Sequence, residues 1–184
     1  MTNRLIYIFA SCLILLSSCQ SQPPENSPID TTHETQTLPA NQPNFNYYVE
    51  TPKNWVIADT VMQDGMRIKL MKAPITLFLD SPFVNIIIVY MQGRNIDEFT
   101  TRNIDYLKSN MQGITILEKG DIDSTIYDGK WFTYNKEQNG MTTDMINYII
   151  PFNGFAYMIT GQTSKGKLTR YKGVFDRIAK SFKG

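Results

Sequence analysis

Three turn dipeptides within about thirty residues constrain this fold more than any other feature: Asp128-Gly129, Asn139-Gly140 and Asn153-Gly154. Asn-Gly and Asp-Gly are the strongest local signals for a tight hairpin, because both turn positions need a positive φ. The segments that follow these turns are rich in β-branched and aromatic residues. The second half of the chain is therefore predicted to be an antiparallel meander.

Further strands are expected before and within this meander. The run Asn85 to Met91 is the most β-branched in the chain and predicts a central strand covered on both faces. The other expected strands are Phe45 to Val49, a strand after the turn Pro52-Lys53-Asn54-Trp55, Met66 to Met71, Ile114 to Leu117 and Ile122 to Ile126.

Two segments change from strand to helix periodicity. Residues 95–111 carry apolar side chains mostly at helical spacing, and Asn95 with Glu98 three residues later is typical of a helix start. Residues 167–182 carry a continuous apolar stripe. Together these elements predict an α+β domain, an antiparallel β-sheet flanked by two or more helices.

The order of these elements resembles the PsbP-like domain, which PsbP shares with Mog-type proteins and DcrB-type bacterial lipoproteins. The resemblance covers nearly all of residues 45–184. It rests on the opening aromatic strand, a Pro-x-Gly-Trp-like turn, the Ile86–Tyr90 strand, the Phe99-containing helix, the Trp131–Tyr157 meander and the closing residues Ile178 to Phe182. Asn54 departs from the usual Gly of that turn, although Asn also tolerates its geometry. The resemblance implies a non-enzymatic accessory, scaffold or binding role.

The amino terminus has the features of a lipoprotein signal. Arg4 precedes a 12-residue run, Leu5 to Leu16, that is uncharged and mostly apolar; it is too short to cross a bilayer but suits a signal peptide. The run ends in Leu16-Ser17-Ser18-Cys19, which resembles the lipobox of bacterial lipoproteins. The alternative is an ordinary secretory signal with a coincidental cysteine. We expect residues 1–18 to be removed and Cys19 to carry acyl chains such as palmitate.

Residues 19–44 are then expected to form a tether between the lipid and the domain at 45–184. Five of the 9 prolines lie in this stretch, with few large apolar residues, so it cannot bury enough surface to fold. The expected location is the bacterial cell envelope, at the outer membrane if the cell is Gram-negative. The expected partners are the membrane, through the lipid on Cys19, and a protein of the envelope.

Several kinds of chemistry are disfavoured by the residue inventory. The formal charge is +1, without the basic excess of a nucleic-acid binder. The only histidine, His33, lies in the tether, and neither Cys12 nor Cys19 would remain as a free thiol. A nucleophilic triad or a thiol site is therefore not expected in the domain. Neither enzymatic activity nor a cofactor is predicted.

One group of carboxylates is a weak candidate for a metal site. Asp121 and Asp123 are expected on one face of a strand, with Asp128 nearby. Oxygen ligands suit Ca²⁺, although a competent site needs six to eight of them. Solvated carboxylates at a strand edge are the favoured interpretation, and no metal is predicted.

Two segments are candidate contact surfaces. Seven of the domain's 17 basic residues lie in 165–183, among them Lys165, Lys167, Arg170 and Lys172. They form either a surface for anionic lipid or an acidic partner, or simply the solvated side of an amphipathic helix.

The second segment, 73–84, is more apolar than an ordinary loop. Its Ile75, Leu77 and Phe78 either contact a partner or lipid, or belong to an edge strand that packs on the core. The leading hypothesis from these observations is a membrane-anchored, non-enzymatic binding or scaffold protein. The alternative is a carrier or sensor of an apolar small ligand with a pocket near 75–83.

Overall fold

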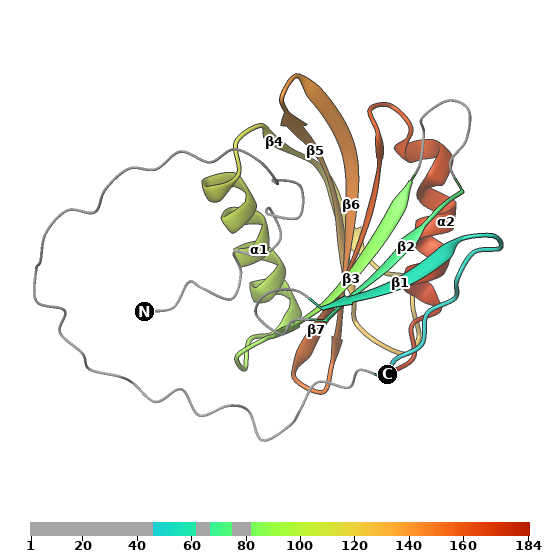
Figure 1. The fold of residues 1–184 in the computed structure, drawn as a ribbon. Helices are drawn as coiled ribbons and strands as arrows, with labels where there is room; N and C mark the ends of the chain where they lie inside the picture. Colours follow the sequence, from blue (N-terminus) through green and yellow to red (C-terminus); the bar gives the residue numbers. More distant parts are fainter. Residues whose placement is uncertain (1–45, 62–66, 75–81) are drawn as a thin grey trace, which may run out of the picture. The chain divides into compact units, whose positions relative to one another are not determined.

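The computed structural model describes residues 46–61, 67–74 and 82–184. These residues form one antiparallel sheet in the order β1-β2-β3-β7-β6-β5-β4 (Figure 1). Its strands are β1 (Val56–Val61), β2 (Arg67–Lys72), β3 (Phe83–Tyr90), β4 (Ile114–Asp121), β5 (Lys130–Gln138), β6 (Met141–Phe152) and β7 (Phe155–Ser164). With two helices, α1 (Ile96–Asn110) and α2 (Leu168–Lys180), the fold is α+β, as the sequence predicts.

Two of the three predicted tight turns are confirmed. Asn139 and Gly140 have φ of 51° and 74° and join β5 to β6. Asn153 and Gly154 have φ of 51° and 81° and join β6 to β7. Positive φ at both positions is what a two-residue hairpin turn requires. These hairpins place β6 between β5 and β7, at the middle of the meander.

The third predicted turn, Asp128-Gly129, is wrong, and so is the strand predicted at 122–126. β4 continues to Asp121, past a bulge between Ile116 and Glu118, and residues 122–129 connect it to β5 without a strand. Trp131 packs against Gly120, where an added Cβ would lie 3.0 Å from the indole ring. The strand predicted at 45–49 is also wrong for its described part, since 46–49 contain only an isolated bridge between Tyr48 and Lys183.

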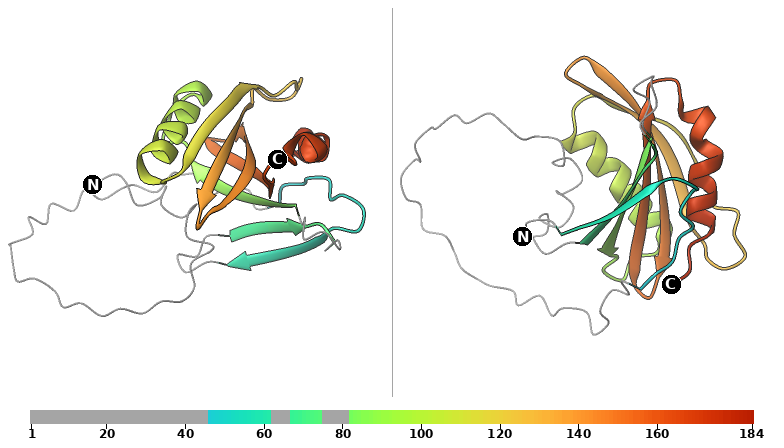
Figure 2. Two further views of the ribbon diagram at one scale, coloured as in Figure 1. Left: turned by 90° about the horizontal axis from the view of Figure 1, so that it is seen from above. Right: turned by 45° about the vertical axis from the view of Figure 1, so that its right-hand side comes forward.

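The two helices cover opposite faces of the sheet (Figure 2). α1 packs on β4, β5 and β6, whereas α2 packs on β6 and β7. The predicted start of α1 is confirmed, because the Asn95 side chain accepts a hydrogen bond of 2.9 Å from the Glu98 N–H. The two helices therefore give the sheet two separate buried faces. In the part of the chain that the structure describes, no helix is long and apolar enough to span a bilayer.

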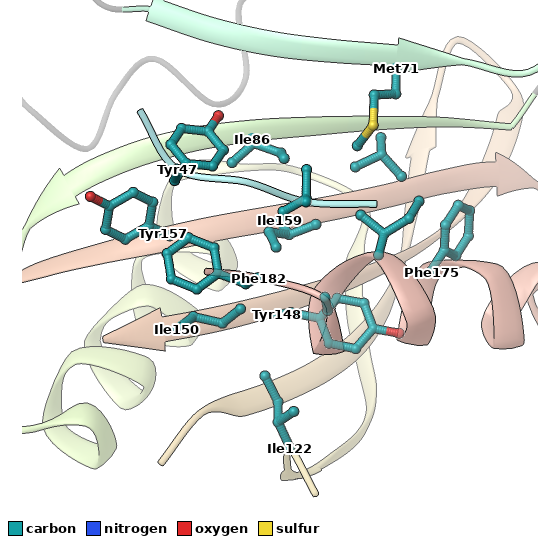
Figure 3. Packing of buried hydrophobic residues seen from close by; sticks show 14 of the residues in the cluster. Tyr47, Met71, Ile86, Ile122, Tyr148, Ile150, Tyr157, Ile159, Phe175 and Phe182 are labelled. Atoms are coloured by element: carbon teal, nitrogen blue, oxygen red, sulfur yellow. The ribbon is translucent and has the colours of Figure 1, made fainter. Parts of the chain in front are cut away.

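The larger core lies between the sheet and α2 (Figure 3). At one end of it, the Phe182 ring centroid lies 4.7 Å from that of Tyr157, and the Tyr157 centroid lies 5.3 Å from that of Tyr47. At the other end, Phe175 and Ile178 of α2 are buried. Each such side chain contributes about 1.5–3 kcal/mol of burial free energy, which holds α2 in a fixed orientation.

β3 is the interior strand that the sequence predicts. Val84 and Ile86 face the core under α2, while Ile87 and Val89 are buried on the other face. A strand that is apolar on both faces needs cover on both faces, which explains its continuous β-branched sequence.

Candidate functional site

The position of α2 is fixed at its first turn by a carboxylate from the sheet. Asp144 on β6 is buried and accepts hydrogen bonds from the backbone N–H groups of Gly166 (2.7 Å) and Leu168 (3.4 Å). Lys167, at the N-cap position, makes no side-chain cap of its own. Asp144 therefore supplies the negative charge that a helix N-terminus favours.

The only acidic residue of 165–183 is turned inward, toward the sheet. Asp176 accepts a hydrogen bond of 2.5 Å from the Tyr148 hydroxyl. The Nζ of Lys172 lies 2.9 Å from Oδ2 of Asp176. Lys172 also lies 5.0 Å from the Trp131 ring centroid, a cation–π geometry. Burial, followed by the neighbouring Asp176 carboxylate, raises the pKa of Tyr148 well above its usual value. Asp176, through Tyr148, and Lys172, through Trp131, therefore each connect α2 to the sheet.

What remains on the outer side of α2 is basic, and residues 164–184 contribute no exposed acidic side chain to it. We call Lys165, Lys167, Arg170, Arg177, Lys180 and Lys183 the basic strip; all six are exposed. The other exposed residues of 164–184 are small or polar: Ser164, Gly166, Thr169, Gly173 and Gly184. None of the exposed large apolar side chains of the described residues lies in this segment.

Two members of the basic strip have charged or aromatic neighbours outside α2. The Nζ of Lys180 lies 3.6 Å from Oδ2 of Asp123, whose side chain is fully exposed. The Nζ of Lys183 lies 5.9 Å from the Tyr48 ring centroid. Within the described residues, Lys165, Lys167, Arg170 and Arg177 form no ion pair. Lys172, which the sequence grouped with the first three, is half-buried and paired, so it does not share their exposure.

The outer side of α1 has a different charge pattern. Oε1 of Glu98 lies 4.0 Å from Nε of Arg94 and 3.7 Å from Nε of Arg102. The Glu98 carboxylate is therefore flanked by two guanidinium groups at i,i+4 spacing. Alternating signs of this kind are typical of a solvated helix face. The uniform sign of the basic strip is therefore a property of α2 and not of every helix surface in this domain.

The predicted carboxylate group does not assemble. Asp121 is the last residue of β4, and its Oδ1 lies 2.5 Å from Nζ of Lys130. The same Nζ lies 2.8 Å from Oδ1 of Asp97, at the start of α1. Hydrogen bonds to Asp121 and Asp97 raise the pKa of Lys130 above its usual value. Asp123 lies beyond the end of β4, so it does not share a strand face with Asp121 as predicted. The described residues, Asp128 among them, contain no group of three or more potential metal ligands.

The apolar segment near 75–83 is described only at its two ends. Ile75, Leu77 and Phe78 lie outside the described residues. The backbone N–H of Ala73 donates a 3.0 Å hydrogen bond to the Pro82 carbonyl, which closes the base of this connection between β2 and β3. Phe83, in β3, is half-buried and pairs with Gln162 of β7.

A row of buried polar side chains lies on the α1 side of the sheet. Asn85, Thr160 and Asn147 are register partners on β3, β7 and β6, so their side chains share one face. The Asn85 Oδ1, Thr160 Oγ1 and Asn147 Oδ1 atoms are buried, and no hydrogen-bond partner is found for them in the described residues. Asn103, from the buried side of α1, likewise has no hydrogen-bond partner for its Oδ1 within the part of the chain that the structure describes. We call these four residues the polar row.

Sequence reasoning missed the polar row because it depends on strand register. Asn85 and Asn147 interrupt otherwise apolar strand segments, and this was the only signal available in the sequence. Asn85 and Asn147 lie on either side of Thr160 because β7 pairs with both β3 and β6. β3 and β7 are far apart in the chain, so this pairing is not evident in the sequence. Buried polar groups without partners are rare in proteins, so the polar row is a second candidate site.

The fold has known counterparts. PA94 of Pseudomonas aeruginosa, a protein of unknown function described as a regulator, is 12% identical over 70% of this chain and 96% of its own, with a TM-score of 0.59. LpqN of Mycobacterium tuberculosis, involved in cell envelope biogenesis, is 11% identical over 74% and 81%, with a TM-score of 0.56. The cyanobacterial PsbP (CyanoP) of Synechocystis is 13% identical over 74% and 85%, with a TM-score of 0.56.

These similarities define the class of fold, which is PsbP-like, as the sequence resemblance implied. At such low identity they establish the fold alone, since one fold hosts many functions. No protein-family model and no curated protein sequence matches this chain. Functional conclusions must therefore come from the residues of the chain itself.

Proposed function

We propose that this chain is a non-enzymatic accessory protein of the bacterial cell envelope, held at a membrane by lipid on Cys19. Its folded domain acts by docking, and the basic strip is the docking surface. The observation that carries this proposal is the positive charge on the outer side of α2, where six Lys and Arg side chains are exposed and residues 164–184 contribute no exposed acidic side chain; Asp123, beside Lys180, is an exposed acidic neighbour from outside this segment. A surface of one sign attracts partners of the opposite sign.

The three-dimensional environment of the acidic residues supports docking over catalysis. Asp144 caps α2, Asp176 binds Tyr148 and Lys172, and Asp121 binds Lys130, so each has a structural partner. A catalytic acid or base would instead face a substrate position. The involvement of LpqN in envelope biogenesis agrees with the proposed location.

The anchor is tested by metabolic labelling with radioactive palmitate. Wild type is expected to incorporate label and to fractionate with membranes, whereas Cys19→Ala is expected to do neither. Cys12→Ala is the matched control, because that residue lies in the segment expected to be removed. Equal labelling of wild type and Cys19→Ala would reject lipid attachment at this residue.

Docking is tested in living cells with a photoreactive amino acid at position 169. Thr169 is exposed beside Arg170, and Ser109 is an exposed position on α1 that serves as the control. The docking proposal expects adducts from position 169, with a protein or with a phospholipid, that disappear when Lys167, Arg170 and Arg177 are replaced by Gln. Adducts that are equally abundant from position 109, or insensitive to that replacement, would contradict it.

A second candidate function is that of a carrier for an uncharged ligand with an apolar part. The polar row favours it, because its amide and hydroxyl groups carry no charge and lie beside Ile87, Met158 and Ile149 on the same face. Such groups suit an ester, amide or hydroxyl group, with the apolar neighbours contacting a hydrocarbon portion. This differs from the predicted pocket near 75–83 in its position and in its polar component.

The carrier function is tested with a photoreactive monoacylglycerol added to the purified full chain. Labelling is expected within β3, β6 or β7, and the replacement Thr160→Val is expected to reduce it. Thr163→Val is the matched control. Thr163 is also buried, and its Oγ1 has no hydrogen-bond partner in the described residues, but it lies in register with Asp144, on the α2 side. Labelling that both variants leave unchanged would reject a ligand at the polar row.

A further inference from the structure

We infer that the partner of the basic strip is an anionic phospholipid bilayer, on which α2 lies with its axis along the membrane surface. This inference rests on the proposed docking function and names the partner. A polar surface that meets lipid headgroups needs positive charge and few protrusions. A protein interface has in addition a desolvated centre, where aromatic residues, Met and Arg are enriched and Lys is depleted.

The basic strip has the first set of properties and lacks the second. Its exposed side chains are basic, and the residues between them, Gly166, Thr169 and Gly173, are small. A Cβ built at Gly173 would meet no atom within 4 Å, so this position is open on its outer side. Tyr171, the aromatic residue beside Arg170, is half-buried and packs against the core. Headgroup phosphates therefore find charge along the whole helix, whereas a protein partner finds no exposed large apolar side chain on α2 itself. Tyr48, an exposed aromatic residue, lies beside Lys183, beyond the C-terminal end of the helix.

The geometry of chain entry agrees with a bilayer partner. Tyr48 and Lys183 exchange backbone hydrogen bonds of 2.8 Å and 2.9 Å, so the amino-terminal end of the described domain lies beside the C-terminal end of α2. The segment expected to carry the anchor, residues 19–44, joins the domain at that same end. A chain of 26 residues can reach at most about 90 Å, and α2 is about 20 Å long. A lipid on Cys19 thus keeps the basic strip within reach of the membrane that holds the anchor.

The charge on α2 sets the expected strength of this contact. Each Lys or Arg near an anionic membrane surface strengthens binding by roughly fivefold, so neutralising Lys167, Arg170 and Arg177 weakens surface contact about a hundredfold. The contact weakens with added salt, because the Debye length falls to about 3 Å at 1 M. The acyl chains on Cys19 do not share this salt dependence.

The test uses the lipidated full chain in nanodiscs and a nitroxide on Thr169→Cys. Residues 20–184 contain no cysteine, so the label is unique once Cys19 is acylated. In discs with phosphatidylglycerol, collision of the nitroxide with a water-soluble relaxation agent is expected to fall severalfold relative to discs of phosphatidylcholine alone. The same label on Ser109→Cys of α1 is expected to remain accessible in both. Added salt, or the replacement of Lys167, Arg170 and Arg177 by Gln, is expected to restore access at position 169.

Each alternative outcome has a distinct meaning. If the nitroxide at position 169 is equally accessible to the relaxation agent in both kinds of disc while the protein stays bound, the inference of a lipid partner is wrong. That result leaves the proposed anchor and docking surface intact. Charge-dependent protein adducts from position 169 in cells, combined with that result, identify an acidic protein as the partner and likewise overturn the inference. Protein that fails to remain on phosphatidylcholine discs shows that Cys19 carries no anchor, which refutes the proposed function instead.

Discussion

The Tyr148 hydroxyl donates a 2.5 Å hydrogen bond to Oδ1 of Asp176, from the middle of the sheet to the inner side of α2. This contact has two consequences. It fixes the rotation of α2, and it removes the only carboxylate of residues 165–183 from the outer side of the helix. The charge of the basic strip therefore depends on a contact made on the opposite side of α2.

The Tyr148–Asp176 contact makes folding sensitive to alkaline pH. The pKa of Tyr148 is raised by burial and by Asp176, so the folded state favours the protonated phenol. A raised pKa contributes its full stabilisation below about pH 10 and loses it as the pH rises further. We expect the free energy of unfolding, measured by urea denaturation, to fall as the pH rises above about 10.

The replacement Tyr148→Phe isolates this effect. It is expected to cost about 1–2 kcal/mol at neutral pH, because the hydrogen bond to a carboxylate is lost, and to reduce the alkaline slope. A smaller slope remains from Tyr134, whose pKa is also raised by burial. An unchanged slope in Tyr148→Phe would show that other groups control the alkaline transition.

Asp144→Ala is expected to destabilise the domain by about 1–2 kcal/mol, because the first turn of α2 loses its only side-chain cap. Asp144→Asn is the matched variant, since it retains an acceptor oxygen without the charge, and an intermediate loss is expected. Urea denaturation measures both, and hydrogen exchange of residues 168–171 shows whether the loss is local. Equal stability of Asp144→Ala and wild type would contradict the capping role.

Two glycines that differ in their surroundings should respond in opposite directions to alanine. At Gly161, under the Phe175 ring, an added Cβ would lie 2.7 Å from ring carbons, so Gly161→Ala is expected to lower the melting temperature. At Gly173, in the middle of α2, an added Cβ meets nothing, and Gly173→Ala is expected to add about 0.5–1 kcal/mol. Destabilisation by Gly173→Ala would show that its outer side is already covered in the free protein.

Divalent cations should leave the stability of the domain unchanged. Asp121 is neutralised by Lys130, and Asp123 lies near Lys180. We expect the same melting temperature in excess chelator and in Ca²⁺ or Mg²⁺ up to about 1 mM, the weakest range of extracellular calcium sites. Lys130→Gln is the informative variant, because it removes the cation that Asp97 and Asp121 share without changing either carboxylate. A rise in melting temperature with Ca²⁺ in wild type would reinstate a metal site at the end of β4.

The parts of the fold that could be predicted are those determined by local sequence. Asn139-Gly140 and Asn153-Gly154 carry their turn geometry in the dipeptide itself, and Asn95 is a cap because of Glu98 three residues later. Asp128-Gly129 failed as a turn because tertiary contacts decide where β4 ends. Trp131 packs on Gly120 and donates a 3.0 Å hydrogen bond from its Nε1 to the Asp121 carbonyl.

The candidate sites were predictable only in part, for a similar physical reason. The basic residues after Gly161 are evident in the sequence, but which of them are free depends on packing. Lys172 faces Asp176 and Trp131, while Arg177 is exposed without an ion-pair partner in the described residues. The polar row could not be found, since it requires the register of β3, β7 and β6.

Lysine footprinting in intact envelopes tests the docking surface most directly, because it needs no substitution. The amine-reactive reagent is added to isolated envelopes and, separately, after detergent solubilisation, and acetylation is quantified by mass spectrometry. The account predicts that Lys165, Lys167 and Lys180 of the basic strip are protected in envelopes and react severalfold faster after solubilisation. Lys108 on α1 and Lys119 on β4, which are equally exposed in the domain, should react at the same rate in both samples. Equal reactivity of Lys165, Lys167 and Lys180 before and after solubilisation would contradict a docking role for the basic strip.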